Sequence, residues 1–289
     1  MYPASFEYFA PETLDEALSF LERYGDEGKI LAGGQSLIPL MKLRFAAPRA
    51  LVDINRIDGL DGLEEGDGHL TIGALVRHKT CERSELLRGR YGVLGSAARQ
   101  IADPIVRNLG TVSGSLAHAD PQGDWPSVML ATRAEVVVRG GDGDRTIPID
   151  ELLDGPFTTT LRPTEIVTDV RVPAPPARAG GAYEKLERKI GDFATVGVAV
   201  HVTLANGHIA TAGIGLTAVG PTSVRARAAE EALAGRAPDA AAIDEASRLA
   251  AEAAQPHADL RGTVEYKRNA VRVLTARALR TAVDAAQAA

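Results

Sequence analysis

A pair of glycines in the segment AGGQSL, Ala32 to Leu37, is the first place in the sequence where chemistry could occur. The pair follows the apolar residues Ile30 and Leu31 and precedes another apolar run. Glycine permits positive φ angles and lets a ligand approach the main chain, and consecutive backbone N–H groups in such a turn can bind an anion. The segment matches neither G-x-G-x-x-G nor the P-loop pattern. It therefore indicates either an anion-binding cradle or a plain turn between a strand and a helix.

A second segment rich in small residues, NLGTVSGSLAHADPQGD, begins at Asn108. Its glycines and neighbouring hydroxyl side chains are Gly110, Thr111, Gly114 and Ser115. Two such loops fit a long ligand with a central pyrophosphate better than they fit a single phosphate. Asp120 and Asp124 in the same segment each either bind a sugar hydroxyl or lie in solvent.

Side chains suited to catalysis or metal binding are sparse. His78 and Cys81 are too isolated to form a metal site, and His118 has no histidine or cysteine at ligand spacing. No G-x-S-x-G elbow is present. Because no acid–base or nucleophile constellation emerges, we expect no catalytic residue and no metal ligand in this chain. A bound cofactor would then carry the chemistry.

The composition narrows the class of protein. A net charge of −6 argues against nucleic-acid binding. The single cysteine excludes an internal disulfide and a cysteine-ligated iron–sulfur site built from this chain alone. No apolar stretch reaches 18 residues, so we expect no transmembrane segment, and the N-terminus lacks the pattern of a signal peptide. These features favour a cytoplasmic protein that works on small molecules or protein partners.

Hydrophobic periodicity predicts mixed helices and strands over the first 173 residues. The predicted helices are 11–24, 35–43, 78–87, 91–102 and 126–134, and the predicted strands are 29–32, 49–57, 69–76, 135–139, 145–149 and 165–173. The segment 103–126 is expected to be a long connection, and connections of that length are usually functional.

The pattern changes after the proline-rich linker 173–181. A hairpin with one buried face, turning at Asn206-Gly207, precedes an alanine-rich helical region over 223–289. We therefore predict an α+β fold with two domains, 1–176 and 177–289. The first would consist of subdomains of about 1–56 and 57–176, and the second of a small antiparallel sheet plus helices.

Five segments occur in an order that is informative as a set. They are AGGQSLIPLMKLR, TIGALVRH, DPIVRNLGTVSGSLAHADPQGDWP, EIVTDVRVP and YEKLERKIGDFATVGVAV. The set resembles the FAD-binding medium subunits of the molybdenum hydroxylases, the xanthine dehydrogenase superfamily, over essentially the whole chain. It is most similar to the medium subunits of aerobic carbon monoxide dehydrogenases. The resemblance implies a two-subdomain FAD-binding domain of the PCMH type followed by a C-terminal flavoprotein domain.

The resemblance also implies roles for the two loops. Main-chain donors of the first loop would hold the FAD pyrophosphate; its residues are Ala32, Gly33, Gly34, Gln35, Ser36 and Leu37. Thr111, Gly114 and Ser115 would form the second phosphate-side loop, which Gly110 would shape. Asp124 would bind a hydroxyl of the adenosine ribose or of the ribityl chain.

The flavin ring would lie among residues from later segments. Ile101 and Ala102 would line its pocket, and Ile166 or Val167 would lie near the adenine or the ring edge. Lys185 would approach the polar edge of the flavin. Phe193 would cover one face of the isoalloxazine, unless it is an ordinary core phenylalanine.

Three positions depart from the family pattern. Ser113 stands where a second glycine is common, and a positive φ there would add strain of about 1 kcal/mol or more. Gln35 occupies a variable position that is often histidine. Phe193 replaces a tyrosine that is frequent in the carbon monoxide enzymes.

The resemblance implies an electron-transfer subunit. A large subunit with a molybdenum–pterin centre and a small subunit with two [2Fe–2S] clusters would be its partners, in a dimer of heterotrimers. Electrons would pass from the clusters through FAD to quinone or another acceptor, at the inner face of the membrane. Carbon monoxide is the expected substrate of the large subunit. Xanthine or N-heteroaromatics such as nicotine and caffeine are alternatives, as are a self-contained flavin oxidase and a non-catalytic interaction protein.

Overall fold

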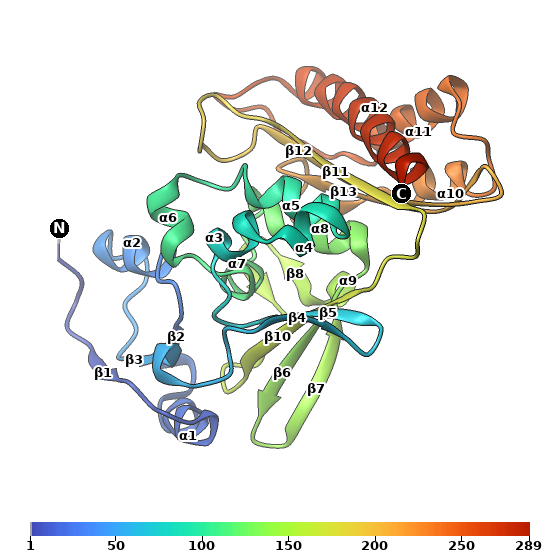
Figure 1. The fold of residues 1–289 in the computed structure, drawn as a ribbon. Helices are drawn as coiled ribbons and strands as arrows, with labels where there is room; N and C mark the ends of the chain where they lie inside the picture. The colour runs from blue at the N-terminus through green and yellow to red at the C-terminus, as the bar shows by residue number, and fades with distance from the viewer. Residues whose placement is uncertain (1) are drawn as a thin grey trace.

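The computed structural model describes residues 2–289 and contains, within them, sheets of three, five and four strands with helices between and around them (Figure 1). A two-stranded ribbon accompanies the second sheet. Successive parts of the chain, 7–53, 63–173 and 179–225, build the three sheets. The protein is therefore an α+β protein, as the sequence predicts.

The N-terminal sheet is parallel, in the order β1-β3-β2. Its elements are β1 (Glu7–Phe9), α1 (Leu14–Tyr24), β2 (Gly28–Leu31), α2 (Leu37–Lys42) and β3 (Ala50–Asp53), with short 3₁₀ turns at Gly25–Glu27 and Ile54–Arg56. The Thr13 hydroxyl accepts a hydrogen bond from the backbone of Glu16 and begins α1. Gly25, with φ of 52°, ends that helix. This unit presents the end of β2, and so the glycine pair after it, at one edge of the sheet.

The middle sheet is antiparallel, in the order β4-β5-β10-β6-β7. Its strands are β4 (Leu63–Gly66), β5 (His69–Gly73), β6 (Glu135–Gly140), β7 (Gly143–Pro148) and β10 (Ile166–Pro173), and the ribbon pairs β8 (Leu153–Gly155) with β9 (Thr158–Thr159). The helices of this part are α3 (His78–Arg83), α4 (Glu85–Gly89), α5 (Gly92–Ala98), α6 (Pro104–Leu109), α7 (Val112–His118), α8 (Asp124–Thr132) and α9 (Ile149–Leu152).

The prediction of a long connection over 103–126 is wrong, because most of this segment forms α6, α7 and the start of α8. The Asp103 carboxylate caps α6 by accepting from the Val106 backbone at 2.9 Å, and Pro104 occupies the first turn. The Thr111 hydroxyl caps α7 by accepting from the Gly114 backbone at 3.0 Å. Each short helix is therefore started by a side-chain cap that compensates for its few apolar residues.

The C-terminal sheet is antiparallel, in the order β11-β12-β13-β14. Its elements are β11 (Ala179–Leu186), β12 (Val196–Ala205), β13 (His208–Thr217), β14 (Val224–Arg225), α10 (Arg227–Leu233), α11 (Ala240–Ala253) and α12 (Val264–Ala288). The prediction that only one face of this sheet is buried is wrong. Helix α12 covers one face, and α5 and α8 contact the other (Figure 1). Side chains on Gly213 and Gly215 would overlap carbonyl oxygens of α8, so these glycines let the strand and helix backbones meet.

The apolar cores cross the predicted boundaries. Leu18 and Val52 of the N-terminal part share a core with Leu75 and Ile166 of the middle part. Tyr183 of the C-terminal sheet belongs to the core of the middle part. The linker is shorter than predicted, because β10 runs to Pro173 and β11 begins at Ala179. We propose that the domain boundary, near residue 176, lies between these two strands. No helix in the described part of the chain has the length and apolar character needed to cross a membrane.

Candidate functional site

A cavity of about 630 Å³ lies between the N-terminal sheet and the middle part of the protein. Both small-residue loops line it, and so do residues at the start of β10. The lining residues predicted from the sequence are Ala32, Gly33, Gly34, Gln35, Ser36, Leu37, Gly110, Thr111, Gly114, Ser115, Ile166 and Val167. Two segments that are far apart in the sequence therefore meet across one space.

The first loop turns at the end of β2 and leaves main-chain donors unused. Gly34 has a φ of 69°, a conformation that L side chains rarely adopt. Its carbonyl oxygen accepts from the Ile38 backbone at 3.0 Å, which begins α2. The backbone N–H groups of Gln35, Ser36 and Leu37 donate to no acceptor among residues 2–289. Such a row of free donors beside a cavity suits an anionic ligand.

The two loops are in direct contact. A side chain on Gly33 would overlap the carbonyl oxygen of Leu109 and would lie 2.8 Å from the α-carbon of Gly110. The Arg77 guanidinium donates to the Leu109 carbonyl oxygen and to the Asn55 side chain. Asn55 in turn donates to the carbonyl oxygen of Ala32 at 2.8 Å. Arg77 and Asn55 therefore tie the first loop to the second.

The second loop enters α7 with further unused donors. The backbone N–H groups of Thr111 and Ser113 find no acceptor within the described part of the chain. Ser113 lies inside α7 and has no positive φ, so the condition under which a serine would add strain here is not met. Its hydroxyl is buried in the cavity wall without a hydrogen-bond partner among residues 2–289.

His78 forms a buried part of the same wall. Trp125 donates its indole N–H to Nδ1 of His78 at 3.0 Å. Burial, reinforced by the positive charges of Arg107 and Arg77, lowers the pKa of His78 to about 4, so the imidazole is neutral at pH 7. Sequence reasoning missed His78, Asn55 and Arg77 as members of this site. The one available signal was the dipeptide Arg77-His78 at the end of TIGALVRH, which carries no ligand spacing.

The remaining predicted residues lie outside the lining of this cavity. Gly191 packs against the backbone of Ala102, where a side chain on it would lie 3.1 Å from the Ala102 carbonyl oxygen. Lys185, whose side chain is 1% exposed, donates to the Gln100 carbonyl oxygen and to Asp124, each at 3.0 Å. Ile101 is buried beside them. Ile101, Ala102, Lys185 and the loop that carries Phe193 thus form a second cluster, where β11 meets the middle part.

Asp124 is held within the protein. Its carboxylate accepts from Tyr183 on one oxygen and from Lys185 on the other. Burial raises the pKa of Asp124, and the charge of Lys185 opposes that effect. The predicted contact with a sugar hydroxyl stays a prediction.

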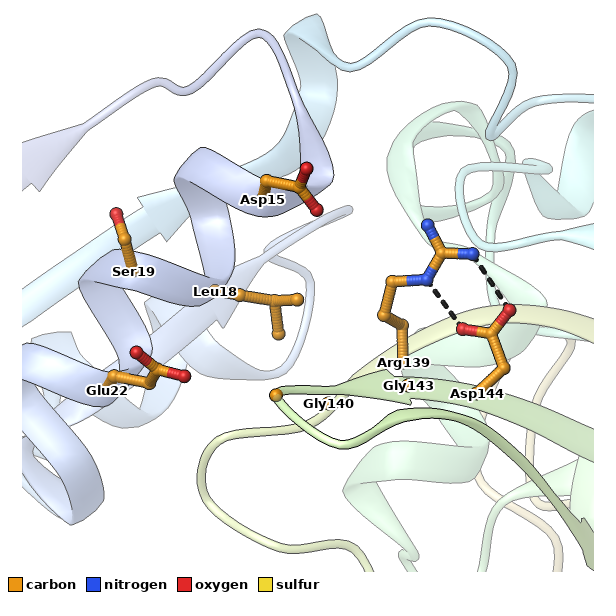
Figure 2. A pocket seen from close by; sticks show the side chains of 9 residues that line it. Asp15, Leu18, Ser19, Glu22, Arg139, Gly140, Gly143 and Asp144 are labelled. Carbon is orange, nitrogen blue, oxygen red and sulfur yellow. Dashed lines mark hydrogen bonds and ion pairs between the residues drawn. The ribbon is translucent and has the colours of Figure 1, made fainter.

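A second cleft, of about 460 Å³, lies between α1 and the β6–β7 hairpin (Figure 2). Figure 2 shows Asp15 and Glu22 projecting from α1, and Arg139 paired with Asp144 across the hairpin. Arg139, the one cation among the described residues that line this cleft, is thus already paired with a carboxylate. Because carboxylates dominate and Arg139 is engaged, this cleft does not suit an anionic ligand.

Side chains for direct catalysis do not gather in the described residues. No group of three or more histidine, cysteine, aspartate or glutamate side chains there could hold a metal ion. Burial raises the pKa of the Cys81 thiol to about 12, so the thiol is protonated at neutral pH. The two loops and their free N–H groups are therefore the main chemical feature of the molecule.

Comparison with known proteins matches both parts of the chain to family models. Residues 4–175 match the FAD binding domain in molybdopterin dehydrogenase, and residues 181–282 match the CO dehydrogenase flavoprotein C-terminal domain. The carbon monoxide dehydrogenase medium chain of Hydrogenophaga pseudoflava is 40% identical over 98% of each chain. The chain belongs to the family of FAD-binding medium subunits of molybdenum hydroxylases. It is a flavoprotein subunit of an oxidoreductase, and FAD is its cofactor.

Two further comparisons place the chain within this family of medium subunits. Subunit alpha of the 6-hydroxypseudooxynicotine dehydrogenase complex of Paenarthrobacter nicotinovorans is 37% identical over 99% of this chain and 97% of its own length. The solved structure of carbon monoxide dehydrogenase from Hydrogenophaga pseudoflava superposes with a TM-score of 0.95 at 43% identity, covering 99% of each chain. The medium-subunit fold is therefore retained across relatives whose named substrates differ.

The residues present fit FAD. The Ser113 hydroxyl and the free N–H groups of both loops have no hydrogen-bond partner among the described residues. They can donate hydrogen bonds to phosphate oxygens. The six-residue helix α6 separates Gly110 from the Ala102 end of the second cluster, a span of about 9 Å at 1.5 Å per residue. An extended dinucleotide held at the glycines can thus reach that cluster.

Phe193, one of the predicted flavin-contacting residues, is 52% exposed. The alternative that it is an ordinary core phenylalanine is therefore wrong. It lies on the loop between β11 and β12, next to Gly191, which contacts Ala102. Its cover over a flavin ring stays a prediction.

Proposed function

We propose that this medium subunit is the flavin station of a carbon monoxide dehydrogenase-type complex. Electrons from two [2Fe–2S] clusters of a small partner subunit would pass through it to quinone or another acceptor. The observation that carries the proposal is the pair of loops with unused N–H groups, together with full-length similarity to a carbon monoxide dehydrogenase medium chain. Bound FAD exchanges electrons singly or in pairs, which suits a position between one-electron clusters and a two-electron acceptor.

The chain's own residues bind and orient the cofactor in this proposal. Main-chain donors of Gln35 to Leu37 and of Thr111 and Ser113 hold the pyrophosphate between the loops. Ile166 and Val167 border the same cavity and pack near the adenine or the ring edge. Thr111 also caps α7, which fixes the direction of its neighbours' N–H groups.

Residues of the second cluster orient the ring end. Lys185 is fixed by Asp124 and the Gln100 carbonyl oxygen, so its ammonium group has one defined position from which to meet the polar edge of a flavin. Asp124 binds a ribose or ribityl hydroxyl, Ile101 and Ala102 line the ring pocket, and Phe193 covers one face.

Carbon monoxide is the proposed substrate of a large partner subunit that holds the molybdenum–pterin centre. Two solved relatives with a TM-score of 0.95 are carbon monoxide dehydrogenases; one is a Cu,Mo enzyme, and the other lacks the Mo-pyranopterin moiety of its molybdenum cofactor. An N-heteroaromatic or xanthine substrate is the alternative, favoured by the 37% identity to a subunit of 6-hydroxypseudooxynicotine dehydrogenase. Reduction of a quinone analogue by the native complex with carbon monoxide, and not with nicotine or xanthine, would support the first. The reverse pattern would overturn it.

The assembly is proposed as a dimer of heterotrimers on the cytoplasmic side of the membrane. Native mass spectrometry of the complex would give two copies of each of three subunits. A monomeric chain that oxidises substrate alone would instead identify a self-contained flavin oxidase.

The cradle itself is tested with two glycines of similar φ. Gly34 in the first loop has a φ of 69°, and Gly235 after α10 has a φ of 74° with open space around it. Alanine at either position adds backbone strain of about 1–2 kcal/mol. We expect Gly34→Ala to lower the flavin-to-protein ratio of the native complex, and Gly235→Ala to leave it unchanged. Equal ratios in both variants would contradict the cradle, and a complex without flavin would overturn the proposed function.

A further inference from the structure

We propose that His78, held by Trp125, donates a hydrogen bond from Nε2 to a phosphate oxygen of the bound dinucleotide. This inference deepens the proposed function and rests on the FAD cradle. It makes the His78–Trp125 pair a built side-chain component of a site that otherwise consists of main-chain donors.

The tautomer of His78 follows from its partner. An indole N–H can only donate, so Nδ1 of His78 must accept from Trp125, and the ring proton must lie on Nε2. Trp125 is fully buried, which shields this bond from water. His78 thus presents a fixed N–H donor on its other edge.

The free edge of the ring lies against the second loop. The His78 backbone donates to the Gly110 carbonyl oxygen at 2.9 Å, which sets the first residue of α3 beside this loop. A side chain on Gly110 would lie 2.8 Å from Nε2 and from the adjacent ring carbon. The imidazole therefore occupies the space where a side chain on Gly110 would project.

The donor on this edge lacks a protein partner. His78 is 5% exposed and lines the cavity. Its Nε2 donates to no acceptor among residues 2–289. This donor lies at the cavity wall without a protein acceptor, so a charged ligand oxygen at this position would gain a hydrogen bond from it.

The charges around the ring help to keep the imidazole neutral. Arg107 and Arg77 are the charged groups that act on the pKa of His78, and both are positive. Arg107 pairs with Glu82 at 3.1 Å, and Arg77 is engaged by Asn55 and the Leu109 carbonyl oxygen. They hold the loops, and their charges oppose a cationic imidazole, so His78 stays a neutral N–H donor. A donor that does not lose its hydrogen at neutral pH suits a phosphate acceptor.

The test compares two replacements of His78 in the native complex. His78→Phe keeps the ring but removes the donor, whereas His78→Gln keeps an N–H near the position of Nε2. After removal of FAD and titration with fresh FAD, we expect the Kd to rise about tenfold or more for His78→Phe, the loss expected for a hydrogen bond to a charged group. We expect His78→Gln to stay within about threefold of the parent. The ³¹P resonances of bound FAD should shift in His78→Phe.

A matched control and the opposing outcomes complete the test. Cys81 lies in the same helix, is fully buried and does not line the cavity, so Cys81→Ala reports on packing alone. A parent Kd and unmoved ³¹P resonances in His78→Phe would overturn the inference. Equal losses in His78→Phe, His78→Gln and Cys81→Ala would overturn it too, since they would indicate packing. A parent complex that takes up no FAD would instead reject the proposed function.

Discussion

At the scale of single residues, the cavity wall carries polar groups whose partners must come from a ligand. The Ser113 hydroxyl is buried there without a partner among residues 2–289, and Nε2 of His78 has no acceptor in the same range. Burial of an unpaired polar group lowers stability. The flavin-free chain therefore carries a cost at Ser113 that a phosphate ligand can offset.

Ser113→Ala should separate the stability cost of the unpaired hydroxyl from its contribution to FAD binding. Removing the orphaned hydroxyl should stabilise the flavin-free chain by about 1 kcal/mol, while FAD affinity falls severalfold because a donor is lost. Thermal unfolding and FAD titration measure the two effects. Ser223 also has a buried unpaired hydroxyl but lies outside the cavity lining, so Ser223→Ala should stabilise the chain without changing FAD affinity. An unchanged FAD affinity in Ser113→Ala would contradict a ligand contact.

His78 should make the protein sensitive to acid. Its pKa falls from 6.5 to about 4 on folding, chiefly through burial, so the unfolded chain binds the proton more readily. The contribution is complete above pH 6.5 and is lost as pH falls toward 4, at about 1.4 kcal/mol per unit and about 3 kcal/mol in all. Urea unfolding of the full chain at several pH values measures the slope.

The control for this slope is a second histidine. His78→Gln should lower the slope between pH 6.5 and 4 and leave the part due to His201, because burial also lowers the pKa of His201 to about 4. His208→Gln, which changes an exposed imidazole, should keep the parent slope. A parent-like slope in His78→Gln would show that other groups cause the acid sensitivity.

At the scale of elements, patterns confined to one stretch of sequence predict the positions of helices and strands well. The alternation of β10 and the periodicity of α1 are local, and these elements occur close to where the sequence predicts them. The short helices α6 and α7 escape prediction because their side-chain caps, Asp103 and Thr111, are residue types that are equally typical of loops. Caps outweigh composition where a helix has only six or seven residues.

The site shows the same division. Both glycine loops were found from their own residues, and the structure places both on one cavity. Asn55 and Arg77 join the loops. They are 22 residues apart in the sequence, and Arg77 is 32 residues from its other partner, Leu109. Contacts of that separation depend on tertiary packing, so no spacing in the sequence indicated them.

Arg261 acts on the element that carries Phe193. From the turn before α12 it donates to Asp192 at 3.2 Å, to the Ala194 carbonyl oxygen at 3.2 Å and to Gln122 at 3.0 Å. Arg261→Gln should loosen the loop between β11 and β12, so that bound flavin becomes more accessible to solvent quenchers while most of it is retained. Stern–Volmer quenching of flavin fluorescence measures this. Arg277→Gln, at an exposed position of α12, is the control, and equal quenching in both variants would refute the clamp.

At the scale of the whole molecule, a shared core and several ion pairs connect the FAD-binding part to the C-terminal part, and the most buried of these pairs is Lys185 with Asp124. Tyr183 of β11 packs in the core of the middle part and donates to Asp124 of α8. Lys185, two residues further along β11, pairs with the other oxygen of Asp124. Because both charges are buried, neither is stable without the other. The two parts of the chain should therefore unfold together.

Replacing only Lys185 should lower the free energy of unfolding more than replacing both Lys185 and Asp124. Lys185→Met leaves a buried carboxylate uncompensated and should lower the free energy of unfolding by about 3–5 kcal/mol. Adding Asp124→Asn removes that charge and keeps an oxygen for the Tyr183 hydroxyl, so the double variant should be more stable than Lys185→Met alone. Urea unfolding of the parent, both single variants and the double variant gives the coupling energy between the two positions. Additive effects, or separate transitions for the two parts in the parent protein, would show that the pair does not join them.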